Sequence, residues 1–177
     1  MGVPERRAFS FCRYEGRMVQ GRPEVFLRQV DLEETNILAE LRAASLLEMG
    51  LLRPAAAAEF RLRGRRQFAR MLREGRLAAW LLFVDGEPVG SAYAVFFERM
   101  PYPETSLHAE IAGVYVAPEF RRRGYASLLV TEALAAARAR GVRRIVLQPG
   151  HGARGLYERL GFADSGQMRL PVEAPAS

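Results

Sequence analysis

An unbroken apolar run, LAAWLLFV from Leu77 to Val84, constrains the fold more than any other feature of the sequence. Its length and composition predict a strand, and Asp85-Gly86 follows it. This dipeptide favours a tight hairpin turn, because both positions tolerate a positive φ. The chain then returns as a second strand from Pro88 to Glu98, and His108 to Val116 predicts a third. We therefore expect an antiparallel set of strands.

Helical periodicity flanks this set on both sides. Before it, a strand at Glu24–Val30 is followed by a helix that Asp31 would cap, running to about Met49, where Gly50 ends it. A second helix is expected from about Ala55 to Arg73. The remaining predicted elements are a helix from Gly124 to about Arg140 closed by Gly141, a strand at Arg143–Gln148, a short helix at Ala153–Leu160 and a last strand at Gln167–Val172.

This order predicts a mixed α/β fold, with helices on both faces of a mainly antiparallel sheet. The strands before and after the Gly124–Arg140 helix should be parallel, since a helical crossover joins them. We expect one domain over residues 23–172. Residues 1–22 would form an N-terminal tail with a short strand at Phe9–Cys12, and residues 173–177 a C-terminal tail.

The basic residues are unusual, because all 26 are arginine and the net charge is +6. Without lysine the chain can form neither a Schiff base nor a phosphate-binding loop of the lysine type. The lone Cys12 excludes an internal disulfide, and Cys12 with His108 and His151 makes a poor zinc ligand set. No apolar run reaches the roughly 18 residues of a membrane span, and no secretory h-region is visible. We expect a cytoplasmic protein.

Five arginines share one side of the second predicted helix, opposite its apolar residues. They are Arg61, Arg65, Arg66, Arg70 and Arg73, and the apolar face holds Phe60, Phe68, Met71 and Leu72. Such charge suits a phosphate-rich cofactor, nucleic acid or an acidic peptide, although a solvated basic surface accounts for most of it. Nucleic acid is the less expected partner, because aromatic interleaving and helix-turn-helix spacing are both missing.

The segment VYVAPEFRRRGYA, from Val114 to Ala126, has the properties of a pyrophosphate site. A strand ends at Val116, and Gly124 and Ala126 allow close approach of the backbone as the next helix begins. A helix N-terminus offers unpaired N–H groups and partial positive charge to phosphate oxygens. The dinucleotide and lysine-type phosphate motifs do not fit, because the loop has one glycine and no lysine. A purely structural turn is the alternative.

The pattern R-x-x-G-x-A at Arg121, Gly124 and Ala126, after V-Y-V-A-P-E-F, resembles the coenzyme-A loop of the GNAT superfamily of N-acetyltransferases. A second block, ARGLYERLGF from Ala153 to Phe162, resembles the C-terminal block of the same family. The blocks stand in the family's order, separated by one helix and one strand. The resemblance covers roughly residues 24–171.

The resemblance implies an enzyme that transfers the acetyl group of acetyl-CoA directly to a primary amine, without a metal. Backbone groups of Val114, Tyr115 and Val116 would bind the pantetheine arm, with the Val116 N–H as oxyanion donor. Tyr157 would protonate the thiolate; a merely packed tyrosine is the alternative. The pyrophosphate would be held by amides of Arg122, Arg123, Gly124, Tyr125, Ala126 and Ser127, with Arg121 supporting the loop. A non-catalytic acetyl-CoA-sensing module is the alternative function.

Glu110 is the candidate general base, because an alkyl ammonium must lose a proton before it attacks at neutral pH. Strand alternation would place Glu110 on the same face as Ala112, Val114 and Val116. Some members of the family carry a catalytic glutamate fourteen positions before the same glycine, as Glu110 stands before Gly124. The alternative is a glutamate paired with an arginine at an exposed strand end.

The sequence also departs from the family. Many relatives carry an asparagine seven positions before the tyrosine, where this chain has Gly150 within the run PGHG. His151, His108 and Cys12 are expected to be ordinary residues. The acceptor would lie between the two N-terminal helices and the loop at 99–107, and the arginine-rich helix favours an anionic acceptor. Acceptor identity, acyl length and a homodimer stay open.

Overall fold

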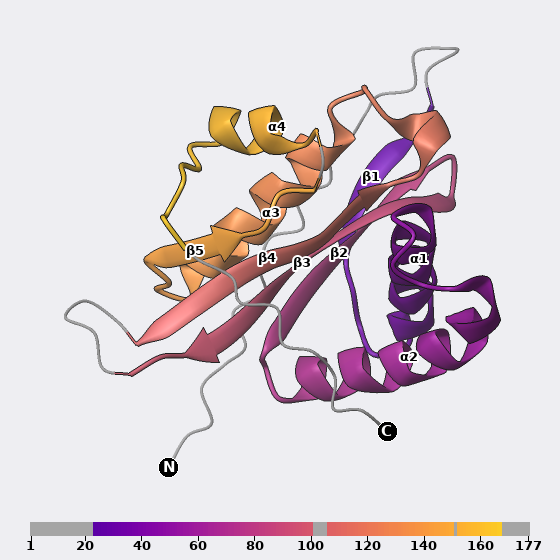
Figure 1. Cartoon of the computed structure of the whole chain (residues 1–177), viewed down its shortest axis with the longest axis horizontal. Coiled ribbons are helices and arrows are strands. Elements are labelled where there is room, and N and C mark those ends of the chain that lie inside the picture. The colour runs from indigo at the N-terminus through magenta and orange to yellow at the C-terminus, as the bar shows by residue number, and fades with distance from the viewer. Residues whose placement is uncertain (1–22, 101–105, 151, 168–177) are drawn as a thin grey trace. The chain divides into compact units, whose positions relative to one another are not determined.

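A computed structural model describes residues 23–100, 106–150 and 152–167 of the chain (Figure 1). Its contacts divide the chain into two compact units, Met1–Leu147 and Gln148–Ser177. The first unit holds a five-stranded sheet in the order β1-β2-β3-β4-β5. Its elements are β1 (Val25–Gln29), α1 (Thr35–Glu48), η1 (Pro54–Ala56), α2 (Ala57–Arg73), β2 (Leu77–Val84), β3 (Glu87–Glu98), β4 (Leu107–Val116), η2 (Pro118–Phe120), α3 (Tyr125–Ala139) and β5 (Arg144–Leu147).

The pairing of the strands agrees with the sequence pattern. β1, β2, β3 and β4 form antiparallel pairs, and β4 pairs with β5 in parallel across the α3 crossover. At the hairpin between β2 and β3, Asp85 and Gly86 both have positive φ, 51° and 83°. These values match a type I′ turn, whose twist suits the flanking strands. The predicted mixed α/β fold is confirmed.

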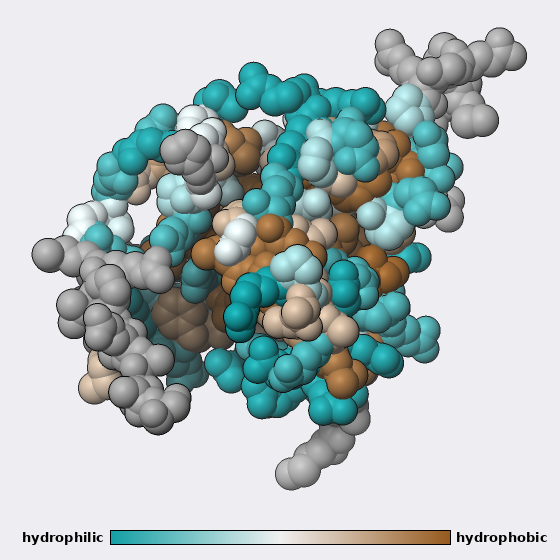
Figure 2. Space-filling model, turned by 45° about the vertical axis from the view of Figure 1, so that its right-hand side comes forward, coloured by the Kyte–Doolittle hydropathy of each residue, from teal (hydrophilic) through white to brown (hydrophobic). Residues whose placement is uncertain are grey.

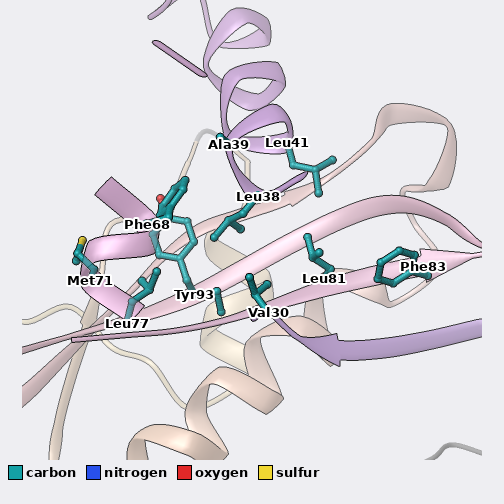
Figure 3. Close-up of a cluster of buried hydrophobic side chains, with 11 residues drawn as sticks. Val30, Leu38, Ala39, Leu41, Phe68, Met71, Leu77, Leu81, Phe83 and Tyr93 are labelled. Atoms are coloured by element: carbon teal, nitrogen blue, oxygen red, sulfur yellow. The ribbon is translucent and has the colours of Figure 1, made fainter. Parts of the chain in front are cut away.

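Helices cover both faces of the sheet. Every residue of β2 is buried, and its alternate residues Leu77, Ala79, Leu81 and Phe83 belong to the core cluster drawn in Figure 3. Leu77, Leu81 and Phe83 point toward α1 and α2, where they join Leu38, Leu41, Phe68 and Met71 in one core cluster. On the other face, a Cβ at Gly90 would lie 3.4 Å from Leu82 of β2 and 3.3 Å from Leu129 of α3. Each large apolar side chain so buried stabilises the fold by roughly 1.5–3 kcal/mol.

The start of α1 differs from the expectation that Asp31 would be its N-cap. The helix begins at Thr35 and Glu34 takes the cap position. Asp31 Oδ1 instead accepts hydrogen bonds from the amides of Glu33 and Glu34, at 2.9 and 3.2 Å. Asp31 therefore organises the turn that precedes the helix, and the buried Glu34 forms an ion pair with Arg28. The sequence pattern could not separate this turn from the first helical turn.

The arginines of α2 lie mainly at the surface. Arg65, Arg66, Arg70 and Arg73 are exposed, while Phe68 and Met71 of the same helix are buried. In the space-filling view, hydrophilic residues cover much of the surface and apolar residues gather toward its centre (Figure 2). Within the described ranges, no helix combines the length and apolar character needed to cross a membrane.

The second unit contains α4 (Arg154–Arg159). Arg154 bonds to Glu158 at 2.8 Å and to Asp164, and the ring of Phe162 packs edge-on against Tyr157 at 6.0 Å between centroids. The last predicted strand, Gln167–Val172, is not formed at Gln167, and its other residues lie outside the described residues. The predicted tail at 1–22 with its strand at Phe9–Cys12, residues 101–105, His151 and the tail at 173–177 also lie outside them.

Candidate functional site

A tight turn joins the end of β4 to the start of α3. The last ladder bond runs from the Ala117 N–H to the Val89 carbonyl at 2.8 Å, and Pro118 then opens the short helix η2. The backbone takes the left-handed conformation at Arg122, with φ 63°, and again at Gly124, with φ 84°. This alternation is typical of concave turns in which successive N–H groups point to one side.

The amides of this turn are available to a ligand. Among the described residues, the N–H groups from Arg122 to Ala126 have no backbone acceptor, whereas the Ser127 N–H donates to the Gly124 carbonyl at 3.0 Å. The free amides lie at the N-terminus of α3, where the helix also contributes partial positive charge. The turn therefore suits an anion, and its free donors are a narrower set than the predicted Arg122–Ser127.

The three consecutive arginines of the turn differ in their contacts. Arg121 donates through Nε to the Val116 carbonyl at 2.8 Å and forms an ion pair with Glu48 at 2.6 Å. The hydrogen bond between these side chains raises the pKa of Arg121 and lowers that of Glu48. Arg123 donates to the Glu119 carbonyl at 3.3 Å. The Arg121 and Arg123 guanidinium groups are thus bonded within the protein, whereas the backbone amides from Arg122 to Ala126 are left for a ligand.

A β-bulge interrupts β4 just before its end. Ser91 lies opposite Tyr115 and Tyr93 opposite Ala112, so β4 has one residue more than β3 between these pairs. The extra length falls at Gly113, which has a φ of 59° and lies against the Tyr93 ring. A Cβ at this position would fall 2.0 Å from Tyr93 Cε1. Ser91 Oγ donates to the Gly113 carbonyl at 3.2 Å and holds the bulge in place.

The bulge corrects the expectation that Glu110 and Val116 share one face of β4. Glu110 lies opposite Val95, and both Val95 and Tyr115 pack against the α1/α2 core. Val116 is buried opposite Gly90, on the α3 side. Strand alternation alone would have kept Glu110 and Val116 together, but the inserted residue reverses the alternation between them. Glu110 therefore shares a face with Ala112 and Tyr115.

The outer edge of β4 is open beyond Ile111 within the first unit. β5 pairs with β4 only from His108 to Ile111, and no other described strand of that unit continues along this edge. The Ala117 N–H bonds to β3, so the alternation of an antiparallel ladder turns the Val116 N–H toward the open edge. An open edge of this kind can accept an extended ligand as if it were a strand.

Glu110 is exposed on the α1/α2 face of the sheet. The alternative expectation, a glutamate paired with an arginine, finds no support, because Glu110 forms no ion pair within the described part of the chain. The neighbouring His108 is 2% exposed. Burial lowers the pKa of His108, as do the charges of Arg99 and Arg144. His108 is thus a buried residue, and Glu110 presents its carboxylate to solvent.

Tyr157 belongs to the second unit. Its side chain is buried, and burial raises its pKa above the ordinary value of a tyrosine. The phenol is therefore protonated at neutral pH, as a proton donor requires. Its predicted catalytic role stays a prediction. No group of three or more His, Cys, Asp or Glu side chains in the described ranges is arranged to hold a metal ion.

Sequence reasoning missed two parts of this site. One is the bulge, for which a glycine inside a strand was the available signal. The other is Glu48, which pairs with Arg121 across 73 positions of sequence. No local sequence pattern predicts a contact between residues so far apart in the chain.

One protein family and several solved structures resemble this chain. The model of the acetyltransferase (GNAT) family matches residues 45–162. A GCN5-related N-acetyltransferase from Ralstonia eutropha JMP134 has 23% identity and a TM-score of 0.73, with 84% of this chain and 99% of that chain covered. A predicted acetyltransferase from Clostridium acetobutylicum, solved with acetyl-CoA, has 21% identity and a TM-score of 0.74, with 84% and 96% covered.

An aminoglycoside N-acetyltransferase in complex with CoA has 19% identity and a TM-score of 0.68, with 88% of this chain and 99% of that chain covered. A search of curated proteins finds no match. The structural likenesses show a shared fold, and the family match covers the turn, α3 and α4. The chain therefore belongs to the acetyltransferase (GNAT) family and is an acyltransferase.

Proposed function

We propose that the protein transfers the acetyl group of acetyl-CoA to a primary amine by direct attack of the amine on the thioester. The observation that carries this proposal is the turn from Arg122 to Ala126, whose free amides follow directly after the open edge of β4. An anion site and an extended edge in this order suit a ligand with a pyrophosphate at one end and an amide-containing arm at the other.

The residues of the first unit would divide the binding of acetyl-CoA between them. The amides from Arg122 to Ala126 would hold the pyrophosphate, while the open edge near Val114 would bond to the pantetheine arm. The Val116 N–H would then donate to the thioester carbonyl and stabilise the oxyanion that forms on attack. The backbone groups of Tyr115 point toward β3, opposite Ser91. The pantetheine arm would therefore bond to the backbone of Val114 and Val116 and not to that of Tyr115.

The chemistry requires two protons to leave the ammonium nitrogen of the acceptor and one proton to reach the thiolate. Glu110, directly or through a water molecule, would take the proton of the ammonium group, which is otherwise protonated at neutral pH. The amine nitrogen then forms a bond to the acetyl carbon, the carbon–sulfur bond breaks, and the nitrogen releases its second proton to solvent. Tyr157 would give its proton to the departing thiolate and recover it from solvent. The products are the N-acetylated amine and CoA.

An acceptor screen tests this function. Acetyl-CoA is incubated with pooled amines, including N-terminal peptides, antibiotics and polyamines, and thiol release is measured. We expect saturable release with at least one pool and mass spectrometry that finds the acetyl group on nitrogen. Binding of acetyl-CoA without release in any pool would favour a sensing module instead.

A matched pair of glycines tests the anion site itself. Gly124 and Gly141 both have positive φ, 84° and 76°, and both have open space where a Cβ would be. Alanine at either position costs about 1 kcal/mol of backbone strain. We expect Gly124→Ala to weaken CoA binding in calorimetry and Gly141→Ala, at the far end of α3, to leave it unchanged. Equal binding by both variants would contradict the site.

A further inference from the structure

A pair of opposite charges flanks the Tyr93 ring on the α1/α2 face of the sheet. Glu110 lies on β4, two residues before the Ala112 that faces Tyr93. Arg42 lies on α1, between Leu41 and Ala43, which are both buried. Leu38 and Leu41 of α1 share the core cluster with Tyr93 (Figure 3).

The position of Arg42 over the sheet follows from the contacts that α1 makes on either side of it. Glu48 is tied to Arg121, just beyond the end of β4. Arg42 lies six residues earlier on the helix, or about 9 Å at 1.5 Å per residue. Leu38, four residues before Arg42, packs in the core cluster that contains Tyr93. Arg42 therefore lies on the stretch of α1 between the Tyr93 cluster and the turn after β4.

Neither charge is neutralised by another residue that the structure describes. Within the described part of the chain, Arg42 and Glu110 form no ion pair with each other or with another residue. Both act on the Tyr93 hydroxyl, whose pKa is raised by burial, lowered by Arg42 and raised by Glu110. Arg42 is only partly exposed, and its guanidinium has no carboxylate partner among the described residues, so its donors are left for the anion of a ligand.

We propose that Arg42 binds an anionic group, a carboxylate or a phosphate, on the acceptor while Glu110 faces the amine of the same molecule. This inference rests on the proposed acetyl transfer and names the class of its acceptor. The guanidinium presents a planar fork of donors that matches either anion in two parallel hydrogen bonds. The acceptor would thus be a small amine that carries a negative charge a few bonds from its nitrogen.

Arg42 is better placed for this role than the arginines of α2. Arg65 and Arg66 are exposed, where water and salt screen their charges. Arg42 is half-buried on the face that holds Glu110, so its interaction with an anion is screened less. A purely structural arginine, with its stem packed on the core, is the competing explanation.

Two substitutions separate these explanations. Arg42→Met keeps an unbranched apolar stem and removes the charge, and Arg65→Met makes the same change on α2. Each variant is assayed with matched acceptors, glycine against glycinamide and phosphoethanolamine against ethanolamine. The quantity compared is the ratio of kcat/KM for the charged acceptor to that for its neutral partner. Because this ratio is compared between variants, differences in amine basicity within a pair cancel.

We expect Arg42→Met to lower the ratio by about 10–100-fold in at least one pair, the size of a lost charge-assisted hydrogen bond. The acceptor pair whose ratio falls shows whether Arg42 binds a carboxylate or a phosphate. Arg65→Met should leave the ratio unchanged. If Arg42→Met lowers both members equally, Arg42 is structural and the proposal is overturned. An equal loss of the ratio in Arg65→Met would also overturn it, because the effect would then be one of general charge.

Calorimetry with CoA-saturated protein keeps the proposed function separate. If glycine or phosphoethanolamine binds the wild type and not Arg42→Met, but no acceptor releases thiol, the anion site stands and the transfer fails. If thiol is released but neutral and charged acceptors react alike, the transfer stands and the anion site fails. The anion site also fails if no charged probe binds at millimolar concentration.

Discussion

Arg121 Nη2 lies 2.6 Å from Glu48 Oε2 and joins the end of α1 to the turn that follows β4. The same guanidinium donates to the carbonyl of Val116, the last residue of β4. One side chain therefore connects the helix on the proposed acceptor side to the strand end that would bind the thioester. The pair is 40% and 43% exposed, so its contribution to stability is that of a surface ion pair.

The Arg121–Glu48 pair should make stability depend on pH. Its hydrogen bond lowers the pKa of Glu48 in the folded state, so its contribution is complete above the ordinary carboxyl pKa of about 4.3. It is lost as the pH falls through the lowered native value. We expect Glu48→Gln to lower Tm by about 1–3 °C at pH 7, from a pair worth about 0.2–1 kcal/mol, and to have no effect at strongly acidic pH. A Tm difference that persists in acid would contradict this.

Replacing the candidate base should slow catalysis without loss of cofactor binding. Glu110→Gln keeps the size of the side chain and cannot accept a proton, so kcat should fall by about 10²–10⁴-fold. The Kd for acetyl-CoA should stay the same in calorimetry. Glu98→Gln, an exposed glutamate on β3, is the matched control. Normal turnover by Glu110→Gln at neutral pH would remove Glu110 from the mechanism.

Removal of the Tyr157 hydroxyl should separate binding from turnover. Phenylalanine retains the ring that packs against Phe162, so the fold of α4 should persist. We expect kcat to fall by at least about 10²-fold while acetyl-CoA still binds. Thiol release and calorimetry on the same preparation measure both quantities. A variant that binds and turns over normally would show that Tyr157 is only a packed residue.

The bulge of β4 should depend on the absence of a side chain at Gly113. A Cβ there would collide with the Tyr93 ring, and alanine is strained at a φ of 59°. We expect Gly113→Ala to lower the free energy of unfolding by about 2–4 kcal/mol and to weaken acetyl-CoA binding. Chemical denaturation and calorimetry test the two effects. Gly86→Ala, with φ 83° and open space around its Cα, controls for backbone strain alone.

Arg140 should stabilise the first unit from the end of α3. Its guanidinium lies 4.0 Å from the centroid of the Phe96 ring, and it donates to the Gly75 carbonyl at 2.5 Å. We expect Arg140→Ala to cost about 1–3 kcal/mol in urea denaturation, the sum of a cation–π contact and a hydrogen bond. The exposed Arg138 on the same helix is the control, and its alanine variant should stay within about 0.5 kcal/mol of wild type.

The elements could be predicted largely from sequence because their signals are local. β2 has the predicted bounds, Leu77–Val84, and the turn at Asp85-Gly86 forms as expected. Gly141 ends α3 with a φ of 76°, as its position suggested. The cap at Asp31 was wrong by one turn, since the same side chain can close a turn or begin a helix. Each of these outcomes depends on residues within a few positions of one another.

The turn before α3 could be predicted from the sequence, whereas the faces of β4 could not. The turn at Gly124 and the helix start after it could be predicted from sequence, because the left-handed φ and the free amides belong to the local backbone. The faces of β4 were not readable, because the bulge at Gly113 depends on Tyr93 and Ser91 across the sheet. The sequence by itself determined most of the described elements, the left-handed turn at Gly124 before α3 and the family resemblance. Only the tertiary structure decided that Glu110 faces α1 while Val116 faces α3, and that Arg121 holds Glu48, since these are contacts between residues far apart in the chain.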